Sequence, residues 1–256
     1  MKEKLQAFER LLNIMDDLRA KCPWDKQQTF ESLRHLTIEE VYELGDSILE
    51  KDHDGIKKEL GDILLHIIFY SKIASEKKLF DITDVINREC EKLIHRHPHI
   101  YGDVKVENAE QVSQNWEQLK LKEGNKSVLG GVPASLPSMV KAMRIQEKAK
   151  SSGFDWETKD QVWEKVMEEL NEFKNEAEKG NAEKMKNEFG DLIFSLINYS
   201  RFIDINPEEA LERTNIKFIK RFKYLEQNAN DNGKKLHDMS LAEMDKIWEE
   251  SKAKEL

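Results

Sequence analysis

The sequence contains few of the residues that break helices or cross-link a chain. Its 256 residues include only 5 prolines and 11 glycines, which is typical of a helical protein with short connections. The two cysteines, Cys22 and Cys90, form neither a disulfide framework nor a zinc-binding pattern, which favours a reduced, cytoplasmic protein. No apolar run reaches the roughly 20 residues of a membrane span, and the chain begins with an amphipathic helix in place of a signal peptide. We therefore expect no membrane partner.

The sequence also lacks an excess of positive charge. Charged residues make up 36% of the chain, but the formal net charge is −9. Without an overall basic field to attract phosphates, nucleic acid is not expected as a partner. An anionic small molecule would need cations placed locally at its binding site.

A duplicated acidic motif is the most prominent feature that the sequence does contain. The pattern E-E-x-x-E, followed by E-x-x-D, returns at a constant offset of 129 residues, as from Glu39 to Glu168. The first copy comprises Glu39, Glu40, Glu43, Glu59 and Asp62, and the second Glu168, Glu169, Glu172, Glu188 and Asp191. Five acidic positions held at one offset indicate two related domains.

Helical periodicity places several of these carboxylates on apolar faces. The apolar residues Leu33, Leu36, Leu44 and Ile48 mark the face expected to be buried. Glu40 lies on it, four residues after Leu36 and four before Leu44. Glu59 and Asp62 lie one turn apart in a segment so apolar that almost no side of it is expected to be exposed. Converging buried carboxylates repel one another and are costly without a counter-charge. A hard divalent cation, Mg²⁺ or Mn²⁺, would resolve this repulsion.

The remaining periodicity predicts an all-α protein of two tandem, related helical bundles. The only concentration of glycine and proline, 123–137, is interpreted as a linker between domains at 1–122 and 138–256. Helices are expected at about 4–20, 29–51, 56–76, 83–96, 109–121, 138–151, 159–179, 183–203, 207–229 and 240–253, with Thr29 or its neighbours as one N-cap.

Four short motifs make the sequence resemble the MazG family of all-α nucleoside triphosphate pyrophosphohydrolases. Besides the paired acidic motifs, they are Cys22-Pro23-Trp24-Asp25, His97-Pro98-His99 and Gly153-Phe154-Asp155-Trp156. The resemblance covers nearly the whole chain. It implies Mg²⁺-assisted hydrolysis of a nucleoside triphosphate to the monophosphate and pyrophosphate by a homodimer. The metal ligands that it implies are Glu40, Glu43, Glu59 and Asp62 in the first half and Glu169, Glu172, Glu188 and Asp191 in the second.

Other residues are candidates for supporting roles. Glu39 and Glu168, one position before the ligand pairs, are interpreted as outer carboxylates or as the base that accepts a proton from the attacking water. The candidates for holding the substrate are Lys184, Lys217, Arg221 and Trp248 in the second half, and Lys92 and Arg96 in the first. The alternatives are that the cations are ordinary surface residues and that the indole of Trp248 packs in the core.

The two halves differ in ways that favour the second as the main catalytic site. The position of Lys184 corresponds to Gly55 in the first half, which therefore lacks that cation. His66 stands where the second half has Ser195. The first half would then be slow, differently selective or architectural.

Two other classes of protein compete with the hydrolase. A di-iron protein would use Glu-x-x-His pairs, whereas this chain has Glu-x-x-Asp. A nucleotide sensor or scaffold would bind the triphosphate tightly without turnover. A zinc site at His95, His97 and His99 is disfavoured because no thiolate or acidic ligand adjoins them.

Overall fold

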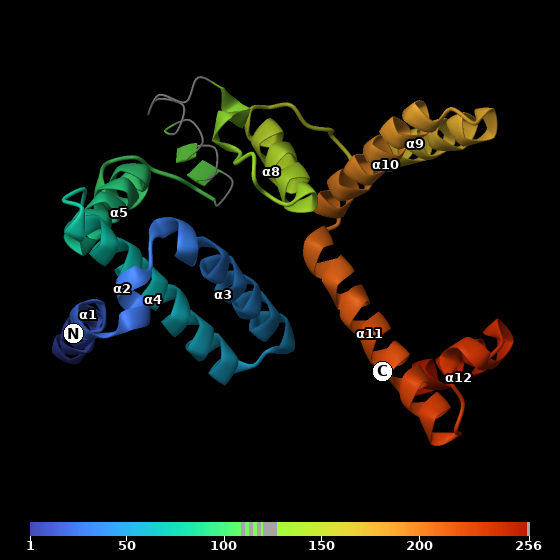
Figure 1. The fold of residues 1–256 in the computed structure, drawn as a ribbon. Coiled ribbons are helices and arrows are strands. Elements are labelled where there is room, and N and C mark those ends of the chain that lie inside the picture. Colours follow the sequence, from blue (N-terminus) through green and yellow to red (C-terminus); the bar gives the residue numbers. More distant parts are fainter. Residues whose placement is uncertain (109–110, 113–114, 117–118, 120–126, 255–256) are drawn as a thin grey trace. The chain divides into compact units, whose positions relative to one another are not determined.

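The computed structural model describes residues 1–108, 111–112, 115–116, 119 and 127–254 (Figure 1). Every regular element within these residues is a helix, which confirms the expected all-α fold. The chain separates into two compact units, Met1–Glu107 and Asn108–Leu256. Of the expected linker, residues 123–126 lie outside the described part of the chain, as does most of the helix expected at 109–121.

The first unit contains the helices from α1 to α6. Their bounds are α1 (Lys2–Lys21), α2 (Pro23–Gln27), α3 (Phe30–Glu50), α4 (His53–Glu76), α5 (Ile82–Arg96) and α6 (Pro98–Tyr101). The short helices α2 and α6 lie between the helices that the sequence predicted at 4–20 and 29–51 and at 83–96 and 109–121. In each, proline takes a first-turn position, where its missing N–H costs nothing.

The second unit contains the helices from α8 to α12 and two 3₁₀ turns. They are η1 (Val128–Gly131), α8 (Ser138–Ser151), α9 (Lys159–Lys179), α10 (Ala182–Phe202), α11 (Pro207–Asp231), η2 (Leu236–Asp238) and α12 (Leu241–Ala253). The helix α9 packs along α10, as α3 packs along α4 in the first unit. No helix in the described residues is both long and apolar enough to cross a bilayer.

The hairpins α3–α4 and α9–α10 each begin with a threonine capping box. Thr29 caps α3 by accepting a hydrogen bond from Ser32 N, and Thr158 caps α9 by accepting one from Gln161 N. In each capping box the side chain at the third helical position also accepts a hydrogen bond from the cap N–H. The two caps lie 129 residues apart, so the offset of the carboxylates extends to the start of each hairpin.

The hairpins also turn at matching positions. Lys51 and Gly180, again 129 residues apart, end the first helix of each pair in the left-handed conformation, with φ of 58° and 70°. The next residues, Asp52 and Asn181, cap α4 and α10 with their side chains. The two hairpins therefore begin and turn at equivalent residues, and their acidic residues lie at equivalent positions between these points.

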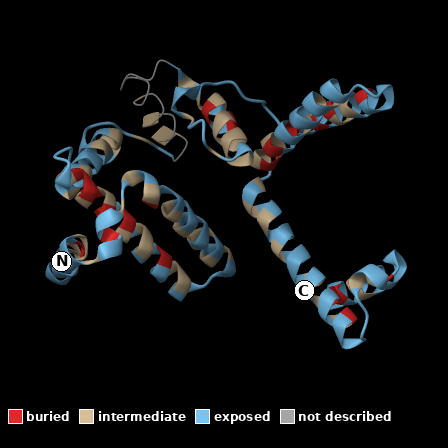
Figure 2. Cartoon of the chain, viewed as in Figure 1, coloured by how far each residue is buried: buried red, intermediate tan, exposed pale blue. Residues whose placement is uncertain are grey.

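Apolar contacts hold the helices of each pair together. In the first unit, Met15, Leu33, Ile68, Phe69 and Ile73 form a buried cluster. In the second, Val162 of α9 and Ile197 of α10 occupy the positions equivalent to Leu33 and Ile68 and are likewise buried. In both hairpins these buried residues lie among many exposed ones (Figure 2).

The expectation that α4 has almost no exposed side is wrong for this chain. Its residues Leu60, Leu64 and Ile67 recur one turn apart and are exposed, and so are the equivalent residues Phe189, Ile193 and Leu196 of α10. We call these six residues the apolar stripes. Ile48, expected on the buried face of α3, is 55% exposed. A single hairpin buries only one face of each helix, and the second apolar face stays uncovered.

Candidate functional site

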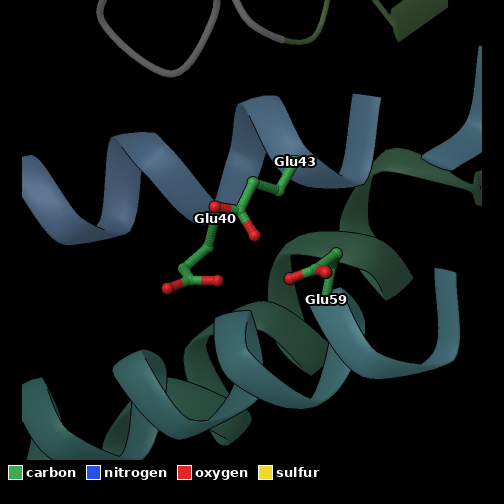
Figure 3. Close-up of side chains that lie close together, drawn as sticks. All are labelled: Glu40, Glu43 and Glu59. Atoms are coloured by element: carbon green, nitrogen blue, oxygen red, sulfur yellow. The ribbon is translucent and has the colours of Figure 1, made fainter. Parts of the chain in front are cut away.

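Three carboxylates of the first hairpin converge between its helices. Glu40 and Glu43 project from α3 and Glu59 from α4, and one oxygen of each lies within 4.8 Å of the others (Figure 3). Glu59 is only 4% exposed, and its Oε2 is buried without a hydrogen-bond partner. The fourth expected ligand, Asp62, is half-buried one turn further along α4 and lies outside this group of three.

The convergence has an electrostatic cost that appears at Glu40. Burial raises the pKa of Glu40, and the charges of Asp62, Glu43 and Glu59 raise it further. Asp62 therefore belongs to the field of the cluster although it lies outside the closest group. Carboxylates arranged in this way gain from any cation placed among them.

A lysine partly supplies that positive charge. Lys58 Nζ lies 2.8 Å from Glu59 Oε1 and 3.7 Å from Glu43 Oε2. The hydrogen bond to Glu59, followed by its charge, raises the pKa of Lys58. An ammonium group thus neutralises part of the first cluster.

The second hairpin repeats the cluster. Glu169 and Glu172 of α9 and Glu188 of α10 place one oxygen each within 4.8 Å of the others. Burial, then the charges of Glu172 and Asp191, raise the pKa of Glu188. Glu169 is buried, whereas Glu172 and Asp191 are exposed, and Asp191 again lies outside the closest group.

In the second cluster the ammonium group comes from the first helix of the hairpin, whereas Lys58 lies on the second helix of its hairpin. Lys165 of α9 lies 2.7 Å from Glu169 Oε1 and 2.9 Å from Glu168 Oε1, and these hydrogen bonds raise its pKa. Its equivalent in the first half is Leu36, while the equivalent of Lys58 in the second half is Asn187. Sequence reasoning missed both lysines, although the spacing of four residues between Lys165 and Glu169 is a known signal for a helical ion pair.

Both clusters have the chemistry of a divalent-cation site. Their donors are carboxylate oxygens from two helices, the set that Mg²⁺ and Mn²⁺ prefer. In the first cluster an unpartnered buried oxygen, Glu59 Oε2, remains available for coordination. In both, a lysine ammonium group stands in for part of the charge that a metal ion would bring.

The cations and the indole expected to hold a substrate lie on several helices. Lys184 is exposed in the first turn of α10. The hydrogen bond from Lys179 lowers the pKa of Glu176 against the opposing effect of burial, and the charge of Lys184 adds a smaller lowering. Lys217 is exposed and Arg221 half-buried on α11, while the acidic cluster belongs to α9 and α10. Lys92 and Arg96 are half-buried on α5, where Lys92 pairs with Glu89.

Trp248 of α12 packs against another aromatic ring. Its indole lies 5.0 Å from the ring of Phe218 on α11, with the planes tilted by 54°. The residue is half-buried. The indole was interpreted above as either a substrate-binding group or a packing group, and the structure provides it with a packing partner.

A cavity of about 490 Å³, which the sequence did not reveal, lies in the second unit. It is lined by Leu129, Ile145, Gln146, Ala149, Phe154, Asp155, Trp156, Phe194, Asn198 and Arg201. Phe194 and Asn198 follow Asp191 by three and seven residues, so this wall of the cavity continues the face of α10 that carries Asp191.

Two polar groups of this cavity are held in place but incompletely paired. Gln146 donates a hydrogen bond to Phe194 O at 2.8 Å, which leaves its buried Oε1 without a partner. Arg201 donates two hydrogen bonds to Asp155, at 2.8 and 2.5 Å, while its buried Nε has no partner. Burial acts to raise the pKa of Asp155, but the hydrogen bonds and charge of Arg201 outweigh it, and the pKa is lowered.

Helical hairpins with a carboxylate cluster in each define a class of all-α protein with a duplicated acidic site. The model of the MazG nucleotide pyrophosphohydrolase domain matches this chain over residues 28–101 and 157–225. These segments begin 129 residues apart, at the offset of the carboxylates and caps. The chain belongs to the MazG family, as its motifs indicated.

Full-length relatives agree with this assignment. The nucleoside triphosphate pyrophosphohydrolase/pyrophosphatase MazG of Thermotoga maritima is 42% identical over 98% of this chain and 98% of its own length. The nucleoside triphosphate pyrophosphohydrolase of Escherichia coli K12 is 37% identical over 98% of this chain and 99% of its own length. Among solved structures, a mazG-related protein from Thermotoga maritima matches 44% of this chain and 98% of its own at 26% identity, with a TM-score of 0.40.

Proposed function

We propose that the protein hydrolyses nucleoside triphosphates, ribo- or deoxyribo-, to the monophosphate and pyrophosphate. The observation that carries this proposal is the convergence of Glu169, Glu172 and Glu188 in a hairpin of the MazG domain. Both relatives described above bear the name of this activity. The two-unit architecture is further proposed to correspond to domains at about 1–122 and 138–256, working in the cytoplasm.

Magnesium, or manganese in its place, is the proposed cofactor. Glu169, Glu172, Glu188 and Asp191 would hold it in the second half, and Glu40, Glu43, Glu59 and Asp62 in the first. A cation there would neutralise triphosphate oxygens and acidify a water molecule. The raised pKa of Glu188 and of Glu40 supports this role, because groups that repel one another in the free protein gain most from a shared cation.

The chain itself supplies a base and counter-charges. Glu168, exposed beside the second cluster, is the proposed acceptor of the proton from the attacking water. Lys165, which bonds both Glu168 and Glu169, would be displaced from Glu169 when a metal ion binds and would then be available to phosphate oxygens. Lys184, Lys217 and Arg221 are proposed to hold the rest of the phosphate chain, and Lys92 and Arg96 to do so in the first half.

The nucleoside is proposed to enter the cavity between α8 and α10. Its volume suits a base and sugar, and its walls of Phe154, Trp156 and Phe194 offer aromatic faces for a planar ring. Gln146 Oε1, an acceptor, and Arg201 Nε, a donor, are buried without partners beside the cavity, so they would reach the edge of a base once their side chains turn towards it. Trp248, packed on Phe218, is not needed for this role.

A homodimer is the proposed assembly. The apolar stripes of α4 and α10 recur at the same offset of 129 residues and are exposed in both halves. Repeated exposed apolar faces on helical hairpins are the surfaces that complete four-helix bundles. A second copy of the chain, which carries the same faces, would cover them.

Product analysis tests the proposed activity. The purified chain would be incubated with a panel of nucleoside triphosphates, with and without Mg²⁺, beside the variant Glu172→Ala. Monophosphate and pyrophosphate that form only with the metal ion, and only with the parent chain, would support the proposal. Diphosphate and phosphate as products would contradict it, and tight metal-dependent binding without turnover would favour a nucleotide sensor.

A further inference from the structure

The cavity of the second unit carries a side-chain amide whose orientation the structure fixes. Asn198 of α10 lines the cavity, and its Oδ1 accepts a hydrogen bond of 2.8 Å from Nη2 of Arg201. A guanidinium group only donates, so the oxygen of the amide is the end that meets Arg201, and the amino group, Nδ2, is the other end. Within the described residues, Nδ2 has no hydrogen-bond partner. The side chain therefore brings an unused donor to the cavity wall.

Arg201 is itself held in place, which keeps the amide in this orientation. Its guanidinium donates two hydrogen bonds to Asp155, at 2.8 and 2.5 Å, and lies 4.7 Å from the ring centroid of Phe202. The side chains of the ion pair are each 19% exposed. Asp155 also accepts a hydrogen bond of 3.0 Å from the backbone N–H of Trp156. A fixed arginine thus occupies the acceptor of Asn198 and leaves the donor for a ligand.

The described lining of the cavity is richer in unused donors than in unused acceptors. The indole N–H of Trp156, which only donates, is without a hydrogen-bond partner among the described residues, and so is Nε of Arg201. Asp155, the one carboxylate of this lining, already accepts three hydrogen bonds. Gln146 Oε1 is an acceptor without a partner, and it is buried. An edge of a ligand that is rich in acceptors complements such a lining.

We propose that Asn198 makes the second half prefer bases with a carbonyl group on the edge that it meets, such as hypoxanthine, guanine and uracil, over adenine and cytosine. The proposal rests on the nucleoside site proposed above. A carbonyl oxygen accepts up to two hydrogen bonds, and the ring N–H beside it is a donor that Gln146 Oε1 could accept. Adenine and cytosine carry an amino group at that place. Two amino groups facing each other would leave donors unpaired in a partly buried site, which is costly.

The position of Asn198 on α10 suits contact with a base. It follows Asp191, a proposed metal ligand, by seven residues, which is two turns and about 10 Å along one face of the helix. Phosphates held at the acidic cluster and a base held at Asn198 would then lie along the same helix, with Phe194 between them in sequence.

The first half lacks this donor. The residue equivalent to Asn198 is Phe69, which is 2% exposed and belongs to the buried apolar cluster. The residue equivalent to Arg201 is Lys72, which pairs with Asp16 at 2.7 Å. Discrimination between bases by an amide at this position is therefore expected from the second half alone.

Kinetics with inosine and adenosine triphosphates test the proposal, because these substrates differ only at the edge of the purine. We expect the parent chain to prefer inosine triphosphate by about tenfold in kcat/KM, the scale for one hydrogen bond. Asn198→Asp keeps an oxygen for Arg201 but replaces the donor by an acceptor, and should abolish or reverse the preference. Asn230→Asp, the same change at an exposed residue of α11, is the matched control and should leave the preference unchanged.

Each other outcome is decisive. Equal turnover of both triphosphates by the parent, or an unchanged preference in a folded Asn198→Asp chain, would overturn the proposal and leave the proposed hydrolase intact. If neither triphosphate is hydrolysed, the proposed activity fails, and calorimetric Kd values for the same pair then test the role of Asn198: a tenfold difference that Asn198→Asp removes would support it, and equal values would overturn it. If Asn198→Asp does not fold, Asn198→Ala removes the donor without adding charge and should bring the ratio close to one, whereas an unchanged ratio would overturn the proposal.

Discussion

Lys165 Nζ lies 2.7 Å from Glu169 Oε1, one turn along the same helix. This ion pair places a cation of the chain where a metal ion is proposed to bind. Lys165→Gln should therefore tighten Mn²⁺ binding, because a competing charge is removed, and should raise KM, because a phosphate ligand is lost. Calorimetry and steady-state kinetics measure the two effects. Lys186→Gln, which removes an exposed lysine paired with Glu183, is the control. Weaker metal binding in Lys165→Gln would contradict the prediction.

The two clusters should contribute unequally to turnover. Glu172→Ala is expected to lower kcat by about 100-fold or more, the scale for loss of a group that stabilises transition-state charge. Glu43→Ala should leave most of the activity, because Lys184 has no counterpart in the first half. Glu178→Ala, an exposed carboxylate of α9, serves as the control for both. Equal losses in the two variants would refute a main site in the second half.

The second cluster should make stability depend on pH. Because the pKa of Glu188 is raised in the folded chain, the native state keeps this proton to higher pH than the unfolded chain does. The free energy of unfolding therefore falls as pH rises through that interval. In chelator, Glu188→Gln should melt above the parent at about pH 7, with little difference near pH 3, where the carboxyl is protonated in both states.

Adding a divalent cation should reverse the order of the two melting temperatures, so that the parent chain melts above Glu188→Gln. The parent chain gains stability by binding the ion, while Glu188→Gln has lost a ligand and gains less. Differential scanning calorimetry with and without Mg²⁺ measures both effects. A parent that melts above the variant even in chelator would show that repulsion at Glu188 is not significant.

Trp248 should act through packing. Trp248→Phe keeps an aromatic ring beside Phe218 and is expected to leave KM unchanged. Trp248→Ala should cost about 1–2 kcal/mol of unfolding free energy, less than the ~3–5 of a fully buried residue. Thermal melts and kinetics separate the alternatives. A higher KM for Trp248→Phe at unchanged stability would assign the indole to the substrate.

The apolar stripes should control assembly. Leu64→Glu combined with Ile193→Glu would bury charge in any interface formed by these faces, and should convert a dimer to a monomer in sedimentation experiments. Leu241→Glu alters a leucine that is 79% exposed but outside the stripes, and should leave the dimer intact. Dimers that persist in the double variant would place the interface elsewhere.

The sequence predicted those features that depend on local pattern. The cap at Thr29, the bounds of α8 and α9, and the pairing of Glu40 with Glu59 all follow from spacing along one helix or between the two helices of one hairpin. The same periodicity overestimated burial at Leu60 and Ile48, because a pattern shows that a face is apolar but not what covers it.

Features formed by residues far apart in sequence, or set by the rotamer of one side chain, could not be predicted. The cavity needs Gln146 of α8 beside Phe194 of α10, a contact across 48 residues with no repeated motif to indicate it. Lys58 bonds the residue next to it in sequence, and only the rotamer adopted in the folded hairpin directs its ammonium group onto Glu59.

The equal spacing of the apolar stripes has a consequence for how copies of the chain can join. If the stripe of each half pairs with the same stripe of a second copy, one two-fold axis satisfies all of them and assembly stops at two chains. If Leu64 of one copy instead met Ile193 of the next without the reciprocal contact, each chain would still offer an unused stripe, and growth would continue into open polymers. The differences between the halves, such as Tyr42 against Asn171 on the outer faces of α3 and α9, then serve to keep like with like.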